Sequence, residues 1–513
     1  MNQQLMTAIW EITAGCNLSC KHCGSACSAS QAGELSTSEA LCLCDQIAAL
    51  GVEWVTLSGG EPLLREDWNQ IAARLDSHGV IVTMITNAWL FDEQMLNKAK
   101  SAGVNTIAVS LDGTEATHDL IRRDGSFQRA LNALEIMKQH RFPSGVITTV
   151  HQQNLSELNE IKQIISDRNI YSWQLQIALP MGNMSRLPEW IIRPEQIDAI
   201  IDFAYETTQE GRVKIKLADC LGYYTLKERE IRKSSTQGEN FLWNGCSAGK
   251  NSIGILHNGN IVPCTSIRDP EMIVGNIRQT PLKELWEDQA CFRKHRGLTK
   301  DLLNGFCKKC RYSSNCLGGC SNLRITSGNG FYGENHYCSY RVAVFRACDE
   351  LLEDTKGWNH LISRIKWLFR RKDFQLAELL IAHALKEHPN SPRLLNYHGF
   401  AHFMLGNFLE SKSAVEKSLK LNPNDAYALN ALGLSLCRSG EVDYGIEILR
   451  KSITLADPAF TDPYYDLAVI LSENNRIEEA LTVLNEGQKK SKTFIMQSQP
   501  LLEHLLNISG KDS

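Results

Sequence analysis

An alternation of two kinds of segment constrains the fold of this chain more than any other feature. Short apolar segments, rich in β-branched and aromatic residues, alternate with segments of helical period through the N-terminal part of the chain. Six such strand-then-helix units predict an α/β fold, a parallel sheet curled into a partial (βα)6 TIM-like barrel with functional residues at the carboxyl ends of its strands. The predicted strands are residues 8–13, 54–57, 80–86, 106–111, 146–150 and 173–178.

Size and composition exclude several classes of protein. A chain of 513 residues exceeds the ~250 to 300 at which a single core stops growing, so we expect more than one domain. Apolar residues make up 43% and charged residues 22%, which is typical of globular proteins. The net charge of -4 gives no basic surface for nucleic acid, and the basic run 364–372 reads as the solvated face of a helix. No membrane span or signal peptide is recognisable, so we expect a cytoplasmic protein with neither a nucleic-acid nor a membrane partner.

The 17 cysteines indicate metal binding, because reducing thiol pools keep disulfides open in the cytoplasm. Cys16, Cys20 and Cys23 are spaced Cys-x3-Cys-x2-Cys on the loop after the first predicted strand. Three thiolates can hold three irons of a [4Fe-4S] cubane and leave the fourth iron open for a ligand. The alternative is a zinc site, although zinc is generally enclosed by two close pairs of ligands.

This triplet on the first loop of a partial barrel resembles the radical S-adenosylmethionine (SAM) superfamily. The resemblance implies that the open iron chelates the amino and carboxylate groups of SAM. Reduction then yields a 5'-deoxyadenosyl radical that abstracts a hydrogen atom from the substrate. His22 departs from the pattern, because the residue before the third cysteine is often aromatic in this family.

Polar motifs follow the next three strands and resemble the contacts that this family makes with SAM. Two glycines permit close backbone approach after the second strand, and the polar turns after the third and fourth would contact ribose and carboxylate. For Thr86 and His118 taken alone, turn formation and helix capping are the simpler explanation. The predicted SAM contacts are Gly59, Gly60, Glu61, Pro62, Asn87, Ser110, Asp112 and Arg122.

A second set of cysteines lies in a segment that is rich in Cys, Gly and Asn and has weak periodicity, as expected of a module that bound metal organises. Part of it could be a zinc ribbon, but after a radical SAM barrel the set is similar to the SPASM domain, which holds two auxiliary [4Fe-4S] clusters. The resemblance assigns Cys246, Cys264 and Cys320 to the first auxiliary cluster, and Cys307, Cys310, Cys316 and Cys338 to the second. With the catalytic cluster, this makes three.

The first auxiliary cluster lacks one ligand, because Asn240 stands where some members carry a further cysteine. Either Cys220 supplies that ligand or one iron stays open to substrate. The remaining cysteines read as small buried hydrophobic residues: Cys27, Cys42, Cys44, Cys291, Cys348 and Cys437.

Helical repeats follow the second cysteine set. Gly399, Gly433 and Ala468 are 34 and 35 residues apart, and two further sets of positions share this period: 377, 411, 445 and 480, and prolines 389, 423 and 458. Small residues at helix crossings and a closing proline match the tetratricopeptide repeat. We therefore expect three domains, 1–220, 221–356 and 357–513.

SPASM enzymes mostly modify peptides or proteins, so the resemblance favours a maturase that cross-links a ribosomally made precursor peptide and takes electrons from a flavodoxin or ferredoxin. Thr265 stands where sulfatase maturases carry an Asp base, which disfavours formylglycine formation. The first strand leaves no room before it for a peptide-recognition domain, so the repeats are expected to hold the precursor. The alternatives are the modification of a protein side chain or a small cofactor such as a tetrapyrrole, and a non-catalytic scaffold.

Overall fold

The structure, a computed structural model, describes residues 4–28, 32–235, 243–355 and 357–509, and it separates into two compact units. The first unit comprises residues 1–308 and 312–342, and the second comprises residues 309–311 and 343–513. Asn240 lies outside the described residues. No described helix is long and apolar enough to cross a membrane.

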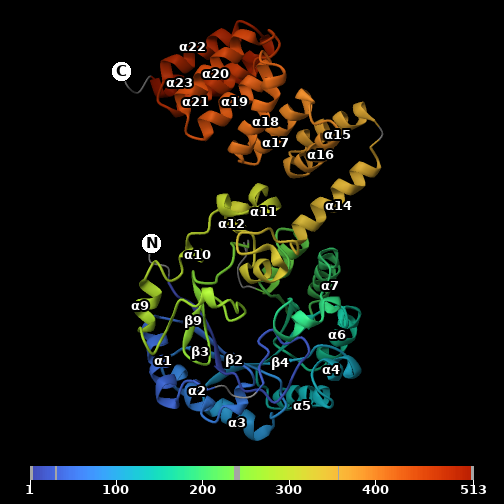
Figure 1. Cartoon of the computed structure of the whole chain (residues 1–513), viewed down its shortest axis with the longest axis vertical. Helices are drawn as coiled ribbons and strands as arrows, with labels where there is room; N and C mark the ends of the chain where they lie inside the picture. Colours follow the sequence, from blue (N-terminus) through green and yellow to red (C-terminus); the bar gives the residue numbers. More distant parts are fainter. Residues whose placement is uncertain (1–3, 29–31, 236–242, 356, 510–513) are drawn as a thin grey trace. The chain divides into compact units, whose positions relative to one another are not determined.

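The first unit is built on the predicted parallel sheet. Each of the six predicted strands is present within one or two residues and pairs in parallel with the next one along the chain. They are β1 (Thr7–Thr13), β2 (Trp54–Gly59), β3 (Ile81–Thr86), β4 (Val104–Ser110), β5 (Ser144–Val150) and β6 (Ser172–Ile177). The α/β fold class is confirmed, and Figure 1 shows the helices arranged around the outside of these strands.

Four further strands extend the sheet at its two edges, and the sequence did not indicate them. They are β7 (Ile215–Leu217), β8 (Ser252–Ile255), β9 (Asn260–Val262) and β10 (Gly275–Asn276). The order is β10-β9-β8-β1-β2-β3-β4-β5-β6-β7, so the sheet is open at β7 and β10. These strands have two to four residues, too few for a period to be recognised.

The helices of this unit pack their apolar residues on the sheet, where Trp10, Trp68 and Trp173 are fully buried in one continuous core. A capping box between Ser36 and Glu39 starts α1. The helices that follow the strands are α1 (Thr37–Ala49), α2 (Trp68–Ser77), α3 (Glu93–Ser101), α4 (Glu115–Ile121), α5 (Ser126–Gln139), α6 (Leu158–Ser166), α7 (Ile197–Glu210) and α8 (Leu226–Ser235). The cysteine-rich part adds α9 (Leu282–Glu287), α10 (Arg293–Arg296), α11 (Gly305–Lys309), α12 (Ser313–Cys316) and α13 (Ser321–Arg324), and α14 (Ser339–Glu353) follows.

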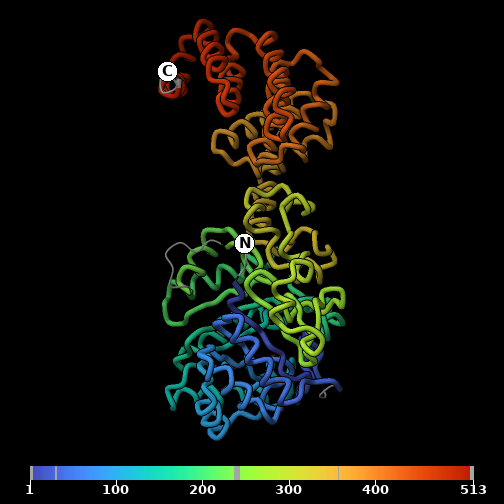
Figure 2. The backbone as a smooth tube through the Cα atoms, turned by 90° about the vertical axis from the view of Figure 1, so that its left-hand side faces the viewer, coloured from blue at the N-terminus to red at the C-terminus, as the bar shows by residue number. Residues whose placement is uncertain are grey.

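The second unit is a stack of antiparallel helix pairs, which Figure 2 shows in chain order. Its helices are α15 (Trp358–Arg370), α16 (Phe374–Glu387), α17 (Pro392–Met404), α18 (Phe408–Leu421), α19 (Ala426–Arg438), α20 (Val442–Leu455), α21 (Asp462–Glu473), α22 (Ile477–Gln488) and α23 (Lys492–Ser509). The predicted small residues lie where paired helices cross: a Cβ atom on Gly433 would lie 2.9 Å from the Gly445 carbonyl oxygen. An all-α repeat region is therefore confirmed, while its assignment as tetratricopeptide repeats and the three domain boundaries stay predictions.

Candidate active site

The first cysteine triplet lies on the loop that follows β1, at the carboxyl edge of the sheet. Backbone hydrogen bonds hold this loop: the Cys16 N–H donates to the Ser28 carbonyl at 2.6 Å, and the Cys23 N–H to that of Cys20 at 3.2 Å. Burial raises the pKa of the Cys20 thiol to about 11, and Arg122 opposes that shift. Because metal binding deprotonates a thiol outright, the iron of a cluster would compensate this cost, and a cation beside the thiolates would assist.

The loop after β2 packs directly against the cysteine loop, and glycines make this contact possible. The Gly60 N–H donates to the Thr13 carbonyl at 2.9 Å, and the Glu61 N–H to the Gly15 carbonyl at 2.8 Å. A Cβ atom on Gly60 would lie 2.1 Å from the Gly15 oxygen, and Gly59 has a φ of 132°. Both positions therefore require glycine.

Glu61 is fully buried and accepts three hydrogen bonds. Its carboxylate accepts from the Thr86 hydroxyl at 2.7 Å, the Asn87 N–H at 2.7 Å and the Leu63 N–H at 3.2 Å. Burial raises the pKa of Glu61 to about 7, against the opposing effect of these bonds. Glu61 thus joins the loops after β2 and β3, and Pro62 begins the single helical turn that follows it.

Asn87 connects the loop after β3 to the cysteine loop. Its Nδ2 donates to Asn17 Oδ1 at 2.8 Å and lies 3.9 Å from Cys16 Sγ. Three of the predicted positions, Glu61, Asn87 and Cys16, are therefore brought together from three separate loops.

Asp112 and Arg122 form a buried ion pair beside the cysteine loop. Arg122 Nε donates to Asp112 Oδ2 at 2.6 Å, and its Nη1 lies 3.8 Å from Cys20 Sγ. His22 Nε2 lies 3.2 Å from the same carboxylate oxygen, and the Thr149 N–H donates to the other at 2.8 Å. Burial alone would raise the pKa of Asp112, but Arg122 and then His22 hold it well below its usual value. Asp112 thus contacts Arg122 and His22 through Oδ2 and the Thr149 backbone through Oδ1. Ser110 ends β4.

The loop after β6 closes on the cysteine loop, and the sequence reasoning missed it. Asn183 Nδ2 donates to the Cys20 carbonyl and its N–H to the Cys23 carbonyl, both at 2.9 Å. A Cβ atom on Gly182 would lie 2.3 Å from the Cys23 oxygen. The polar turn Met181–Asn183 after the last predicted strand was the available signal, because every earlier strand of the sheet carries such a turn.

The ring of His151 lies near His22. The His151 ring stacks on Trp190 with centroids 5.3 Å apart, and its centroid lies 6.0 Å from that of His22. Burial lowers the pKa of His151 to about 4 and that of His118 to about 3, so both imidazoles are neutral at pH 7.

Electrostatic interactions link several of the later cysteines, while their division into two ligand sets stays a prediction. Burial, and then the thiols of Cys246, Cys220 and Cys264, hold the pKa of Cys320 well above its ordinary value. Burial, and then Cys316 and Cys307, do the same for Cys338. Cys310 follows α11 directly in the chain.

The surroundings of Arg324 show whether the cysteine-rich region is suited to anionic clusters. It has no exposed surface, and its three guanidinium nitrogens have no hydrogen-bond partner in the described structure. Burial lowers the pKa of Arg324, and the thiols that oppose this shift are Cys307, Cys246, Cys320 and Cys316, which come from both predicted ligand sets. An unpaired buried cation is costly, and thiolate-ligated clusters would supply the missing negative charge. The residues therefore fit the implied clusters.

The other cysteines follow the prediction with one exception. Cys44 and Cys348 are buried, and Cys27, Cys291 and Cys437 are partly buried. Cys42 is exposed, so its prediction as a buried residue is wrong. On α1 it points away from the core-facing residues Leu43, Cys44 and Ile47.

Comparisons with known proteins agree with this geometry. The radical SAM superfamily profile matches residues 10–165, and that of the SPASM iron-sulfur cluster-binding domain matches residues 246–311. An AdoMet-dependent heme synthase of Methanosarcina barkeri is 32% identical over 341 residues, which cover 65% of this chain and 95% of that protein. The mycofactocin maturase MftC of Mycolicibacterium smegmatis is 26% identical over 336 residues, covering 64% and 81%.

Solved structures share the fold. SuiB of Streptococcus suis bound to S-adenosylmethionine aligns with a TM-score of 0.54 at 16% identity, covering 66% of this chain and 78% of SuiB. The enzyme anSMEcpe, with bound AdoMet and a peptide, aligns with a TM-score of 0.52 at 19% identity, covering 68% and 98%. The cysteine loop, the loops packed on it and the relatives that match them lead to one conclusion: this chain belongs to the radical SAM superfamily and is a radical SAM enzyme with a SPASM domain.

Proposed function

We propose that this radical SAM enzyme modifies a ribosomally synthesised precursor peptide by cross-linking two of its side chains, and that the repeat unit holds the peptide. The observation that carries the proposal is a groove of about 1160 Å³ in the repeat unit, lined by residues of α15, α17, α19, α21 and α23. Stacked helical repeats of this kind suit extended chains. A peptide substrate also agrees with SuiB, which has been solved bound to the precursor peptide SuiA.

Each predicted site residue has a role in this proposal. When bound, the catalytic cluster and SAM supply a carbon radical that abstracts hydrogen. Cys16, Cys20 and Cys23 would hold that cluster, and Arg122, oriented by Asp112, would offset the negative charge of the thiolates. The remaining predicted contacts would position SAM: Gly59, Gly60, Glu61, Pro62, Asn87 and Ser110.

The auxiliary clusters would accept the second electron and pass it on to the oxidised form of a flavodoxin or ferredoxin. Cys246, Cys264 and Cys320 would ligate the first, and Cys307, Cys310, Cys316 and Cys338 the second. We propose Cys220 as the fourth ligand of the first cluster, since Cys220 is among the thiols that raise the pKa of Cys320. Cys220→Ala is expected to change the electron paramagnetic resonance signal of that cluster, and an unchanged signal would contradict the assignment.

The central experiment is co-expression of the chain with the short peptides encoded beside its gene. A cross-linked peptide loses two hydrogen atoms, and tandem mass spectrometry locates the two residues by the missing fragments between them. A Cys16→Ala variant, which cannot complete the catalytic cluster, is the matched control. Peptides of unchanged mass with the active enzyme would contradict the proposal.

A second candidate is modification of a tetrapyrrole, and a specific observation favours it. The relative that is 32% identical over 95% of its length is named a heme synthase. Incubation of the reconstituted enzyme with SAM, dithionite and a panel of iron porphyrins, followed by chromatography at the absorbance of the porphyrin, distinguishes the two candidates. A new porphyrin product without peptide modification would replace the peptide proposal.

Reconstitution also separates an enzyme from a scaffold. Three [4Fe-4S] clusters correspond to about twelve irons per chain, and reductive cleavage of SAM releases 5'-deoxyadenosine. Low iron content without cleavage would count against the three-cluster assignment.

A further inference from the structure

The groove of the repeat unit, called the repeat groove here, has walls of aromatic rings. Tyr427 stacks on Phe460 with centroids 3.8 Å apart, and Phe369 packs edge-on against Phe400 at 5.0 Å. Tyr427 is 61% exposed and Phe400 is 41% exposed, although large rings are usually covered. The basic run that the sequence placed on a solvated face contributes Lys366 and Phe369 to this wall. The rings offer flat surfaces for the stems of long side chains and for cations.

Two asparagines in the groove carry acceptors that nothing satisfies. Asn396 and Asn430 occupy equivalent positions 34 residues apart in successive repeats. Each donates its amide nitrogen to a carboxylate, Asn396 to Asp425 at 2.9 Å and Asn430 to Asp466 at 2.7 Å. Because a carboxylate only accepts, this pairing fixes the amide orientation and leaves each Oδ1 as the free group. Both Oδ1 atoms are buried without a partner in the described structure, so an N–H donor that reaches them by local rearrangement of the groove wall finds two free acceptors.

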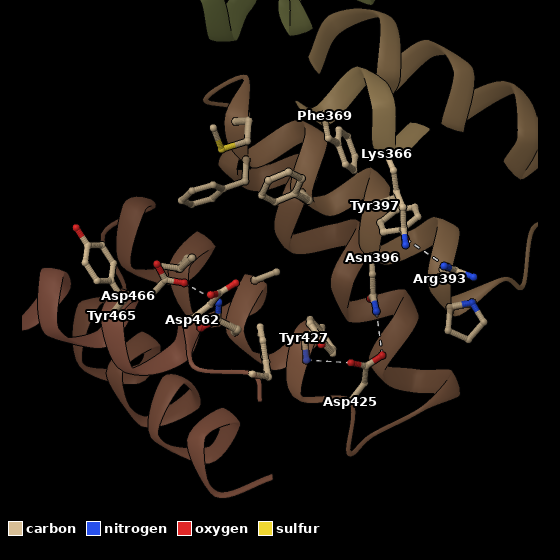
Figure 3. A pocket seen from close by; sticks show the side chains of 18 of the residues that line it. Lys366, Phe369, Arg393, Asn396, Tyr397, Asp425, Tyr427, Asp462, Tyr465 and Asp466 are labelled. Atoms are coloured by element: carbon tan, nitrogen blue, oxygen red, sulfur yellow. Dashed lines mark hydrogen bonds between the residues drawn. The ribbon is translucent and has the colours of Figure 1, made fainter. Parts of the chain in front are cut away.

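One end of the groove carries carboxylates without counter-ions. Asp462 and Asp466 lie there on α21 (Figure 3). Among the described residues, no Lys, Arg or His nitrogen lies within 4.0 Å of either carboxylate. Burial, and then the nearby Asp462, raise the pKa of Asp466 to about 6. Two neighbouring carboxylates that repel each other are stabilised by a cation from outside the chain.

The opposite end has the opposite charge. Lys366, Arg393 and Tyr397 lie together there, separated from the Asp462 end by Asn396 and Asp425 (Figure 3). Arg393 donates to the Tyr397 hydroxyl at 3.3 Å. The charges therefore give the groove a direction, positive at α15 and α17 and negative at α21.

We infer that the repeat groove selects an extended peptide segment that carries a Lys or Arg side chain, which pairs with Asp462 and Asp466 while backbone N–H groups donate to Asn396 and Asn430. A peptide is the ligand that combines regularly spaced N–H donors with a cation on a long stem, and the rings beside the path cover that stem. The identification of this segment as part of the substrate rests on the proposed function. The preference for a cationic peptide is independent of that function.

The test uses the full-length, reconstituted enzyme and a capped ten-residue peptide library in which one fixed position is Lys, norleucine or Glu. Norleucine retains the aliphatic stem without the charge. We expect the Lys library to bind at least about tenfold more tightly than the norleucine library, and the Glu library to bind more weakly still. Equal dissociation constants for Lys and norleucine would overturn the inference.

Variants of the two carboxylates assign the preference to this site. In Asp462→Asn/Asp466→Asn the preference for Lys should disappear, and each single variant should lose part of it. Glu447→Gln, an exposed charge change on α20 outside the groove, is the matched control and should keep the full preference. Retained helicity by circular dichroism shows that the double variant is folded, and a folded double variant that still prefers Lys would overturn the inference.

The outcome is separable from that of the proposed function. If no encoded peptide is modified but the Lys library binds through Asp462 and Asp466, the groove inference stands and the maturase proposal fails. If a peptide is cross-linked equally well, at limiting concentration, by the enzyme and its double variant, the maturase proposal stands and the groove inference fails.

Discussion

Each unit buries polar groups without partners, and one site in each unit calls for a partner of a different charge. In the cysteine-rich part of the first unit, the guanidinium of Arg324 has no hydrogen-bond partner among the described residues, and the thiols of Cys307, Cys246, Cys320 and Cys316 interact with its charge. In the repeat unit, Asn396 and Asn430 carry acceptors without partners among the described residues, and the neighbouring Asp466 has no cationic partner there. Because folded proteins rarely leave buried polar groups unpaired, each set indicates the missing partner: an anionic group in the first unit and a cationic donor in the second.

The largest expected effect separates the two units completely. Cys16→Ala removes one ligand of the catalytic cluster, so reductive cleavage of SAM should fall to background and about four irons per chain should be lost. Binding of the Lys peptide library to the repeat groove should stay unchanged. Cys42→Ala, at the exposed cysteine of α1, is the control and should alter neither property. Residual 5'-deoxyadenosine formation by Cys16→Ala would show that this loop does not hold the catalytic cluster.

The second prediction tests whether the group that pairs with Arg324 is an anionic cluster. In Arg324→Met the buried cation is gone, so the chain without iron should become more thermally stable, while the reconstituted enzyme should become less so. A nearby positive charge favours the reduced state of a cluster, and its loss should lower the auxiliary potentials by on the order of 50 mV or more. Potentiometric titration and thermal unfolding of both forms measure this. A stability change of the same sign with and without clusters would contradict the assignment.

Local sequence signals were enough for the barrel and for the loops that follow its strands. The strands β1 to β6 have six or seven residues and are rich in apolar and β-branched side chains, and the first cysteine triplet and the glycine motif stand at the carboxyl ends of β1 and β2. The edge strands β7 to β10 were missed because they are too short to show a period and are stabilised by pairing with a sheet that already exists.

Contacts between distant loops were not predictable. The contacts of Asp112 with Arg122, His22 and the Thr149 N–H depend on three loops meeting, and its contact with SAM stays a prediction. Asn183 lies 163 residues from the Cys20 carbonyl that it contacts, so its position after β6 indicated a polar turn but not the loop that this turn would meet. The repeat period was visible, but the orientation of Asn396 and Asn430 depends on carboxylates from neighbouring helices.

A smaller effect on stability and SAM binding is expected at Glu61, whose buried carboxylate accepts three hydrogen bonds. Glu61→Gln puts an amide nitrogen against one of three donors, so we expect a loss of about 1 to 3 kcal/mol in stability and at least about tenfold weaker SAM binding. Calorimetry and equilibrium dialysis of SAM measure these. Glu66→Gln, the exposed neighbour, should change neither, and unaltered SAM affinity in Glu61→Gln would remove Glu61 from the predicted SAM contacts.

The smallest effect concerns Asp466, whose pKa of about 6 lies above the ordinary value of 3.8. A carboxyl with a raised pKa destabilises the fold once it is ionised, so the stability of the repeat unit should fall as the pH rises from about 4 to 6 and then level off. Asp466→Asn keeps the bond from Asn430 and removes the charge. In this variant, the free energy of opening measured by hydrogen exchange at the amides of α19 and α21 should rise by up to about 2 kcal/mol at pH 7.5 and should hardly change at pH 4. Asp443→Asn, at an exposed carboxylate on α20, is the control.

The same variant sharpens the contrast between the units when peptide is added. With the Lys library bound, the cation supplies the counter-charge that Asp466 lacks. The wild-type chain should therefore gain more protection from hydrogen exchange than Asp466→Asn, and the difference in protection between the two chains should shrink or change sign. If peptide protects both chains equally, the unpaired carboxylate is a cost of the fold and has no part in recognition. In that case, of the carboxylates and acceptors that the groove offers, the acceptors on Asn396 and Asn430 would remain to bind a peptide.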